Sequence, residues 1–460
     1  MPSDLFYTIH SENAIPLCFI TEEQWQEGVD AITANERNSL SGQGFTGKLG
    51  EYCLIHDNEG HISKAYIGAG EGNQVLAIAN AAIQLPAGCY VSQEDLSRTA
   101  DVTWSLAQYN FSEYKKQDWV PRVLVVDKGT LPAVIAEAET IFLVRDLINR
   151  PTNDLGPEEL AIALAKVGKQ YDAHFKQWVG NELLVSNLHA IHTVGRASAR
   201  EPRLLTLTWG DETHPRLTLI GKGVCFDSGG LDLKPSSAMR LMKKDMGGAA
   251  HVIGLAQWVM SKQLPVHLRV FIPAVENSVG SDSFRPGDII KMYNGLTVEV
   301  DNTDAEGRLI LADAIAKASE EKPDLLIDFA TLTGAARAAV GTDIAAMFCN
   351  NDEVAQAIME SSKAVDDPIW RLPLFAGYEE LLNSTVADLL NASPLPFAGA
   401  ITAALFLQRF IPKSLPWVHF DIMAWNISTR PGKPEGGEAM ALRALMHYLE
   451  KTYSEVKSRP

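Results

Sequence analysis

Residues 217–230 have the sequence Leu-Thr-Leu-Ile-Gly-Lys-Gly-Val-Cys-Phe-Asp-Ser-Gly-Gly, a short apolar run followed by a glycine-rich segment that carries a lysine and an aspartate. Apolar runs of similar length occur at 204–208, 266–272 and 325–329. Short runs bounded by polar, Gly or Pro residues are typical of strands buried on both faces. These runs therefore predict the strands of one central sheet.

Helical patterns lie between these runs, at 249–260 and 309–318. Strands that alternate with helices indicate an α/β domain with a largely parallel central sheet. An earlier helical pattern at 131–147 ends in a Pro- and Asn-rich turn. Because single hydrophobic cores stop growing at roughly 250–300 residues, a chain of 460 residues is expected to hold two domains. We place them at 1–145 and 146–460.

The composition is that of a globular protein, with 46% hydrophobic and 21% charged residues, which excludes a disordered chain. Nothing approaches the ~18 uncharged apolar residues of a membrane span. Residues 1–7 have neither the basic nor the apolar region of a secretion signal. The five cysteines are odd in number and form no CxxC pair, as expected of free thiols in the cytoplasm.

The charge balance disfavours nucleic acids and anionic membrane surfaces as partners. The chain has 40 basic and 57 acidic residues, a net charge of −17. Residues 1–150 hold 10 basic and 20 acidic side chains (net −10), which leaves 30 and 37 (net −7) for the remainder. Since neither part is basic, we expect electrostatic repulsion from a phosphate backbone.

Two glycine-rich segments, 221–245 and 302–308, concentrate charged residues, and each begins where an apolar run ends. In parallel α/β sheets, ligands bind beyond the carboxyl ends of the strands. We therefore expect the charged side chains of both segments to form one site. They are Lys222, Asp227, Lys234, Asp245, Asp304, Glu306 and Arg308.

Four carboxylates in one site would repel one another and raise their pKa values until some became protonated. Two divalent cations would cancel the charge of −4, and carboxylate oxygens suit hard cations. A two-metal site with the ions roughly 3.5–4 Å apart is the simplest interpretation. Histidine is missing from the set and HExxH does not occur, so Zn²⁺ would have oxygen ligands, and Mn²⁺ and Mg²⁺ also fit.

The basic residues suggest three different roles. Lys222 could lose its proton beside a cation and become a ligand, because like charge and burial lower a lysine pKa. Lys234 could polarise a carbonyl and stabilise an oxyanion. The guanidinium of Arg308 suits a carboxylate-like anion. Any one Asp or Gly here could instead be a turn former or helix cap, but the complete set favours a site.

Residues 302–309, Asn-Thr-Asp-Ala-Glu-Gly-Arg-Leu, resemble the octapeptide signature of the leucyl aminopeptidase (cytosol aminopeptidase) family, peptidase family M17. Residues 221–230, Lys234-Pro235 and 244–246 match the same family in order and spacing. The similarity covers residues 145–430, and the part before it matches in size and position. The resemblance implies a smaller N-terminal α/β domain and a larger catalytic α/β domain, assembled as a homohexamer.

The resemblance also implies a metal-dependent aminopeptidase that releases N-terminal residues from short peptides. Two metal ions, Mn²⁺ or Zn²⁺, would share Asp227 and Glu306. Asp304 would bind one ion, and Lys222 and Asp245 would bind the other.

The catalytic residues implied by the resemblance are Lys234 and Arg308, the latter holding a bicarbonate that acts as general base. The positions that line the substrate pocket would be Met242, Asn302, Thr331, Leu332 and Gly334.

The segment 417–426 keeps the family's His-x-Asp-Ile frame but carries Met423, Trp425 and Asn426 where better-known members have smaller or aliphatic residues. The specificity, leucine-type or broader, therefore stays open. Two alternatives also remain, namely a non-peptidase two-metal hydrolase such as a phosphatase and a DNA-binding architectural role as in some relatives. The signature octapeptide disfavours the first and the acidic charge disfavours the second.

Three further features are expected to be structural. His251 and His419 stand near the charged segments, and we expect each to make a core or capping hydrogen bond rather than to bind a metal. Cys225 is expected to pack as a small apolar residue because no histidine is paired with it. Residues 42–47 form a GxGxxG pattern, but a strand-like run follows in place of a helix, which favours a simple glycine turn.

Overall fold

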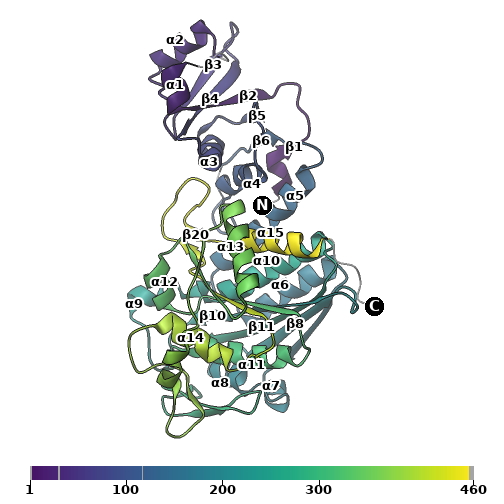
Figure 1. Ribbon diagram of the computed structural model, residues 1–460, viewed down its shortest axis with the longest axis vertical. Helices are drawn as coiled ribbons and strands as arrows, with labels where there is room; N and C mark the ends of the chain where they lie inside the picture. The colour runs from purple at the N-terminus through teal and green to yellow at the C-terminus, as the bar shows by residue number, and fades with distance from the viewer. Residues whose placement is uncertain (1–2, 29–31, 117, 455–460) are drawn as a thin grey trace. The chain divides into compact units, whose positions relative to one another are not determined.

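The computed structural model describes residues 3–28, 32–116 and 118–454, and the chain divides into two compact units (Figure 1). The first comprises Met1–Phe142 with Ile427–Glu435, and the second Leu143–Asn426 with Gly436–Pro460. The sequence patterns contain no indication that the short segment Ile427–Glu435 returns to the first unit. The domain boundary after residue 145 stays a prediction.

The first unit is built on a six-stranded sheet with the order β1-β6-β5-β2-β4-β3. Its pairings are parallel except that β3 runs antiparallel to β4. The glycine pattern at 42–47 runs from the last residue of α2 into the turn before β3, with positive φ at Gly44 and Gly47, as expected of a glycine turn. The elements are η1 (Ser3–Phe6), β1 (Tyr7–Thr8), β2 (Ile15–Thr21), α1 (Glu22–Glu27), α2 (Ala34–Gly42), β3 (Tyr52–His56), β4 (Ile62–Gly70), α3 (Gln74–Gln84), β5 (Gly88–Ser92), α4 (Arg98–Ala107), β6 (Arg122–Val125) and α5 (Leu131–Asn149), which continues into the second unit.

The second unit is built on a large sheet with the order β16-β15-β18-β14-β9-β11-β8-β7, in which β10 also pairs with β11. The four apolar runs of the sequence correspond to β8 (Arg203–Trp209), β9 (Arg216–Gly221), β11 (His267–Asn277) and β14 (Leu325–Ala330), so the strand predictions are confirmed. Every residue of β14 is buried, as expected for a central strand.

The sheet is parallel in the centre and antiparallel towards both edges. Strands β18, β14, β9 and β11 are mutually parallel, whereas β8 and β15 each run antiparallel to the central strand beside them. A largely parallel sheet is therefore confirmed. The remaining strands are β7 (His174–Val179), β10 (Gly223–Asp227), β12 (Ile289–Lys291), β13 (Thr297–Glu299), β15 (Ala345–Cys349), β16 (Ile369–Arg371), β17 (Leu389–Leu390), β18 (Trp417–Asp421), β19 (Trp425–Asn426) and β20 (Gly436–Gly437).

Helices cover both faces of the large sheet. Figure 1 shows α10 and α6 on one side and α11 and α8 on the other, in agreement with their contacts to the central strands. The two expected helices correspond to α10 and α11. The helices are α6 (Pro157–Gln170), α7 (Glu182–Val185), α8 (His189–Gly195), α9 (Ser236–Met239), η2 (Met242–Met246), α10 (Gly247–Ser261), α11 (Glu306–Ser319), α12 (Gly334–Val340), α13 (Asp352–Ala364), η3 (Ala376–Leu382), α14 (Gly399–Gln408) and α15 (Leu442–Tyr453).

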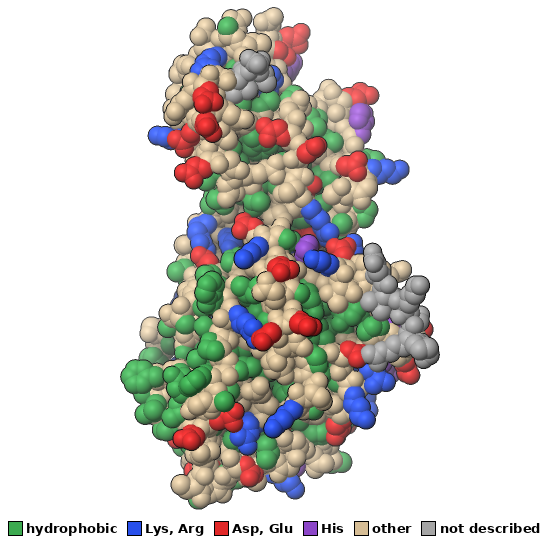
Figure 2. Space-filling view, in the orientation of Figure 1, with side chains coloured by type: hydrophobic (Ala, Val, Ile, Leu, Met, Phe, Trp, Pro, Cys, Tyr) green, Lys and Arg blue, Asp and Glu red, His purple; other side chains and the backbone are tan. Residues whose placement is uncertain are grey.

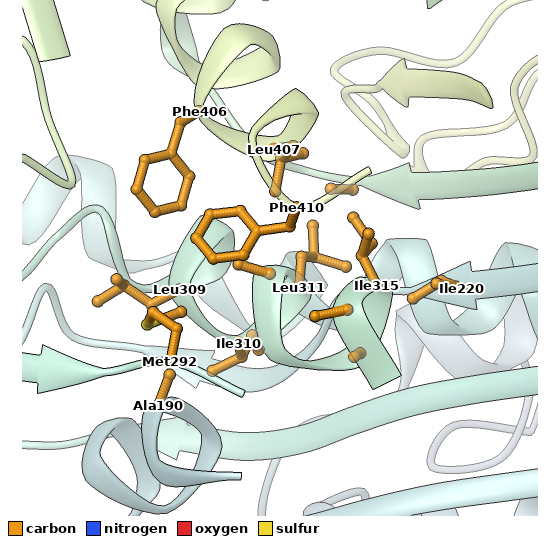
Figure 3. Close-up of a cluster of buried hydrophobic side chains, with 14 of the residues drawn as sticks. Ala190, Ile220, Met292, Leu309, Ile310, Leu311, Ile315, Phe406, Leu407 and Phe410 are labelled. Carbon is orange, nitrogen blue, oxygen red and sulfur yellow. The ribbon is translucent and has the colours of Figure 1, made fainter. Parts of the chain in front are cut away.

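A large hydrophobic core holds α11 between its neighbours. Phe406 and Leu407 of α14 belong to the same buried cluster as Leu311 and Ile315 of α11, and Figure 3 shows part of this cluster. Burying a large apolar side chain contributes roughly 1.5–3 kcal/mol. The core therefore fixes the position of α11, whose first residue is Glu306.

Backbone groups meet closely where α10 begins. The amide of Ala249 donates to the carbonyl of Lys222 at 2.8 Å, and the amide of Lys222 donates to the carbonyl of Phe329 at 3.0 Å. A Cβ on Gly248 would lie 2.1 Å from the carbonyl oxygen of Phe329. Only glycine allows this approach, so Gly248 sets the distance between α10 and the strand ends that carry Lys222.

We expect Gly248→Ala to lower the free energy of unfolding by about 1–3 kcal/mol, since the added methyl group overpacks the site. It would clash with the backbone carbonyl of Phe329, and the clash can be relieved only by shifts of the backbone. Urea unfolding followed by circular dichroism measures the change. Gly42→Ala is the matched control. Gly42 also lies in a helix, and a Cβ added there would meet nothing within 4 Å. Equal stability of the two variants would contradict the close approach.

None of the helices in the described part of the chain has the length and hydropathy that a membrane span requires. On the face shown in Figure 2, basic and acidic side chains are interspersed. This agrees with the absence of a basic half in the sequence.

Candidate metal centre

The first charged segment lies at the carboxyl end of the large sheet. Lys222 links β9 to β10, and Asp227 is the last residue of β10, which pairs with the final residues of β11. Both side chains are only 3% exposed. The chain then turns back, and the amide of Lys234 donates to the carbonyl of Ser228 at 2.9 Å.

The second charged segment reaches the same place from a different sheet. It follows β13, which belongs to a small sheet with the order β12-β13-β17 rather than to the large one. The expectation that this segment begins at a strand end holds, but its strand lies outside the central sheet. Glu306 begins α11, where the partial positive charge of a helix N-terminus favours a carboxylate.

Three carboxylates converge on Lys222. One oxygen of each of Asp227, Asp245 and Glu306 lies within 4.8 Å of the other two. The Lys222 Nζ lies 2.7 Å from Asp245 Oδ2 and 3.0 Å from Glu306 Oε1. Lys222 also donates to the carbonyl of Thr331 at 3.2 Å. Residues far apart in sequence thus surround one buried ammonium.

The fourth carboxylate, that of Asp304, belongs to the cluster through its ion pair with Lys234. Lys234 Nζ lies 2.9 Å from Asp227 Oδ2 and also pairs with Asp304 Oδ1. Asp227 and Asp304 therefore pair with Lys234, whereas Asp245 and Glu306 pair with Lys222. Asp227 also interacts electrostatically with Lys222. All six predicted acid and lysine residues come together, as the sequence indicated.

The electrostatics of the cluster favour added positive charge. Burial, and to a smaller extent repulsion from Asp227, raises the pKa of Glu306 to about 8 and that of Asp304 to about 6. Burial alone would lower the pKa values of Lys222 and Lys234, but attraction to the carboxylates raises both. Four carboxylates and two lysines leave a charge of −2 when all are ionised.

Unsatisfied oxygens give the cluster the donors of a cation site. Glu306 Oε2 and the amide oxygen of Asn277 are buried and have no hydrogen-bond partner among the described residues. A buried oxygen without a partner costs free energy that a bound cation would offset. The donor set, carboxylate oxygens with an amide oxygen nearby, therefore fits a hard divalent ion.

Asn277 is a residue that the sequence analysis missed. It ends β11, and its amide group donates to Asp227 Oδ1 at 2.9 Å and to the carbonyl of Thr303 at 3.1 Å. It thus joins the two charged segments. A single asparagine at the end of an apolar run carries no pattern that would have identified it.

The segment 331–334 lies against the acid cluster. Thr331 Oγ1 donates to Asp245 Oδ1 at 2.8 Å. Asp421 accepts from the amides of Leu332 and Thr333 at 3.0 and 3.1 Å, and from Thr333 Oγ1 at 2.6 Å. Asp421 therefore fixes the entry to α12, a role for which the His-x-Asp-Ile frame was the only indication in the sequence.

The other predicted substrate positions lie on the same segments. Met242 begins η2 and is half-buried, and Gly334 begins α12. The side chain of Asn302 is used inside its own loop, where its oxygen accepts from the amide of Asp304 at 2.7 Å. Their roles toward a substrate stay predictions.

Arg308 is held through one end of its guanidinium by a backbone carbonyl. It is 8% exposed, and its Nη1 donates to the carbonyl of Asn391 at 2.9 Å. Its Nε is buried without a hydrogen-bond partner in the described ranges. Burial lowers the pKa of Arg308 to about 10, so the guanidinium stays charged at neutral pH and suits an anion.

The two histidines near the cluster make core hydrogen bonds, as expected. His251 Nδ1 lies 2.6 Å from the carbonyl of Gly247, and His251 Nε2 accepts from the amide of Met440 at 2.9 Å. His419 Nδ1 lies 2.6 Å from Asp328 Oδ1. Neither histidine belongs to the carboxylate group that could hold a metal.

Comparison with known families agrees with this geometry. The model of the cytosol aminopeptidase family catalytic domain matches residues 142–446, and the model of the M17 aminopeptidase N-terminal domain matches residues 15–125. The chain belongs to the cytosol aminopeptidase family. The resemblance inferred from the octapeptide and its neighbouring segments is confirmed.

Three similar proteins match over nearly the whole chain. A crystal structure of a cytosol aminopeptidase from Coxiella burnetii is 45% identical, has a TM-score of 0.94 and covers 98% of this chain and 100% of its own. A probable cytosol aminopeptidase from Syntrophotalea carbinolica is 36% identical over 93% of this chain and 95% of its own. The bottromycin maturation enzyme BotP in complex with Mn is 32% identical, with a TM-score of 0.86 over 95% of this chain and 99% of its own.

These matches also confirm the two-domain α/β fold of the cytosol aminopeptidases. They identify the chain as a member of a family of peptide-hydrolysing, metal-dependent enzymes.

Beside the cluster, Asp328 holds His419 and Trp417 in the core. Its second oxygen accepts from Trp417 Nε1 at 2.6 Å, and all three side chains are fully buried. Burial would lower the pKa of His419, but attraction to Asp328 outweighs this effect and raises it. The ion pair makes its full contribution to stability at pH values below the pKa of histidine in the unfolded chain, about 6.5. This contribution is lost as the pH rises through the raised pKa that His419 has in the folded state.

We expect Asp328→Asn to cost about 3–5 kcal/mol at pH 5–6, because it leaves a buried imidazolium without its partner. The loss should shrink as the pH rises and His419 becomes neutral. Thermal unfolding between pH 5 and 9 measures this trend. Asp352→Asn is the control, since the Asp352 side chain is 90% exposed in its pair with Arg371 and should cost less than about 1 kcal/mol at any pH. A pH-independent loss would rule out the charged pair.

Proposed function

We propose that the protein is a dinuclear metallo-aminopeptidase of the cytoplasm that releases N-terminal residues from short peptides. The observation that carries the proposal is the convergence of Asp227, Asp245 and Glu306 on one point beside Lys222, in a chain of the cytosol aminopeptidase family. The name of that family and the free state of all five cysteines support the location.

Asp227 and Glu306 would hold both ions, Asp304 one ion, and Lys222 with Asp245 the other. Asp227 pairs with Lys234 and also has an oxygen in the group with Asp245 and Glu306, and this position supports shared ligation together with the unpartnered oxygen of Glu306. Mn²⁺ and Zn²⁺ are the favoured ions and Mg²⁺ is a third candidate; the Mn in the BotP structure supports Mn²⁺. Such ions would supply Lewis acidity at this site, for the free α-amino group, the peptide carbonyl and a water molecule.

The chain's own residues would supply the remaining catalytic groups. Lys234, already at the edge of the carboxylate cluster, would donate to the carbonyl oxygen as negative charge develops there. Arg308 would hold a bicarbonate through donors that include its Nε, which has no partner among the described residues, and such an anion would supply a general base near the reacting groups. The role of the Arg308 guanidinium would therefore be to position the bicarbonate.

The first residue of the substrate would lie against Met242, Asn302, Thr331, Leu332 and Gly334. Thr331 and Leu332 are fixed by Asp245 and Asp421, so this surface is preorganised. Met423, Trp425 and Asn426 differ from the family's better-known members.

We further propose a homohexamer. Several large apolar side chains are strongly exposed in the second unit, including Phe397 at 74%, Val386 at 64% and Trp370 at 58%. Figure 2 shows hydrophobic side chains gathered near α9, α12 and α14. Exposed apolar groups of this kind are common at subunit contacts.

The decisive experiment is hydrolysis of a panel of aminoacyl-p-nitroanilides by chelator-stripped protein, before and after addition of Mn²⁺ or Zn²⁺. We expect activity only with metal and only on substrates with a free amino group. p-Nitrophenyl phosphate and a mobility-shift assay with DNA at low salt test the two alternatives. Hydrolysis of the phosphate alone, or DNA binding without peptidase activity, would refute the proposal.

We expect Lys234→Ala to lower kcat by ~10²-fold or more, as for removal of an oxyanion donor. The bound metal measured by elemental analysis should stay at the wild-type level, since Lys234 is not among the proposed ligands. Lys262→Ala is the matched control because Lys262 also pairs with a carboxylate, Glu450 at 2.8 Å, at a half-exposed position. An unchanged kcat for Lys234→Ala would remove Lys234 from the mechanism.

We expect chelator-stripped protein to bind two Mn²⁺ ions per chain in isothermal titration calorimetry, and Glu306→Gln to weaken the binding of both because each ion loses an anionic ligand. A rise in Tm on adding metal follows, since an ion that binds only the folded state stabilises it. Glu320→Gln is the control, because Glu320 accepts from the Tyr293 hydroxyl at the surface. A single tight site in the wild type would contradict the dinuclear assignment.

A further inference from the structure

One buried asparagine outside the octapeptide contacts both the backbone of its loop and the guanidinium of Arg308. Asn391 is 0% exposed and directly follows β17, which runs parallel to β13. Its amide donates to the carbonyl of Glu299 in β13 at 3.0 Å. The small sheet therefore places Asn391 beside the point where the chain leaves β13 for the octapeptide.

The side chain of Asn391 uses all of its hydrogen-bonding capacity on that loop. Its oxygen accepts from the amides of Asp301 and Asn302 at 2.8 and 3.2 Å. Its amide group donates to the carbonyls of Asn302 and Ala305 at 2.7 and 3.4 Å. An amide side chain has two donors and two acceptor sites, and here all four are used.

The backbone of the same residue orients Arg308. The Asn391 carbonyl accepts from Arg308 Nη1 at 2.9 Å, in a region where the guanidinium is buried. This bond uses one side of the guanidinium, while Nε has no partner among the described residues. Asn391 thus fixes the turn that carries Asp304 and also the direction in which Arg308 presents its free donors.

From this geometry we propose that Asn391 is a positioning residue of the active site, which sets the octapeptide loop and aims Arg308 at its anion. The inference rests on the proposed function for the identity of that anion. The loop-setting part concerns the protein alone.

Asn350 provides a comparison within the same unit, at an exposed position. It makes the same kind of bridge elsewhere, since its oxygen accepts from the amide of Trp417 at 2.8 Å and its amide group donates to the carbonyl of Leu415 at 2.9 Å. The segment that it joins carries none of the proposed catalytic or metal-binding residues. Asn350→Ala therefore reports the structural cost of losing such a bridge.

The test compares wild type, Asn391→Ala and Asn350→Ala as full-length, metal-loaded protein, with kcat and KM measured over a range of bicarbonate concentrations. For Asn391→Ala we expect kcat to fall by ~10-fold or more, because small displacements of catalytic groups cost up to ~10²-fold. The bicarbonate concentration for half-maximal activity should rise, while KM and bound metal change less than about 3-fold. Asn350→Ala should leave kcat and the bicarbonate dependence unchanged.

Hydrogen exchange of the amides of Asp301 and Asn302 gives a second measurement that does not depend on activity. We expect faster exchange in Asn391→Ala and no change in Asn350→Ala. Asn391→Ser, which keeps a hydroxyl, replaces the alanine variant if that variant does not fold. Unchanged exchange, or a loss of kcat that only follows the loss of metal, overturns the proposal.

The two hypotheses fail in different ways. A wild-type protein without metal-dependent peptidase activity refutes the proposed function, and the hydrogen exchange then decides the loop-setting role alone. An active wild type with an unaltered bicarbonate requirement in Asn391→Ala refutes the aiming of Arg308 and leaves the proposed function intact.

Discussion

Charge compensation at the carboxyl end of the large sheet is the constraint on which the rest of the second unit depends. Four carboxylates meet there in a largely buried space, and two lysines offset only half of their charge. Each carboxylate needs separate support to stay in place. Asn277 holds Asp227, Thr331 holds Asp245, and the start of α11 favours the charge of Glu306.

Much of the fold and the chemical character of the site could be predicted from the sequence. Apolar runs predict β8, β9, β11 and β14 because central strands must be apolar on both faces. The acids and lysines were identifiable because carboxylates and lysines together after strands are chemically unusual. The antiparallel edges of the sheet were not predictable, since strand direction depends on connections that leave no local pattern.

The supporting residues could not be found in the same way. Asn277, Asn391 and Asp421 each contact a segment at least 26 residues away, and nothing adjacent to them indicates the partner. Strands β13 and β17, of three and two residues, are too short for a periodic signal. Their importance appears only once the chain is folded, because it lies in hydrogen bonds between distant backbones.

The lysine–carboxylate pairs give the two lysines a structural role beside their proposed chemical one. In a zinc finger the cation is needed for folding, because little else holds the ligands together. Here Lys222 and Lys234 pair with the acids in the folded chain, and the apolar side chains of α11 and α14 pack in one core. The same two ammonium groups that would serve the proposed chemistry therefore also hold the carboxylates together, so a change at either lysine alters the architecture of the site as well as its reactivity.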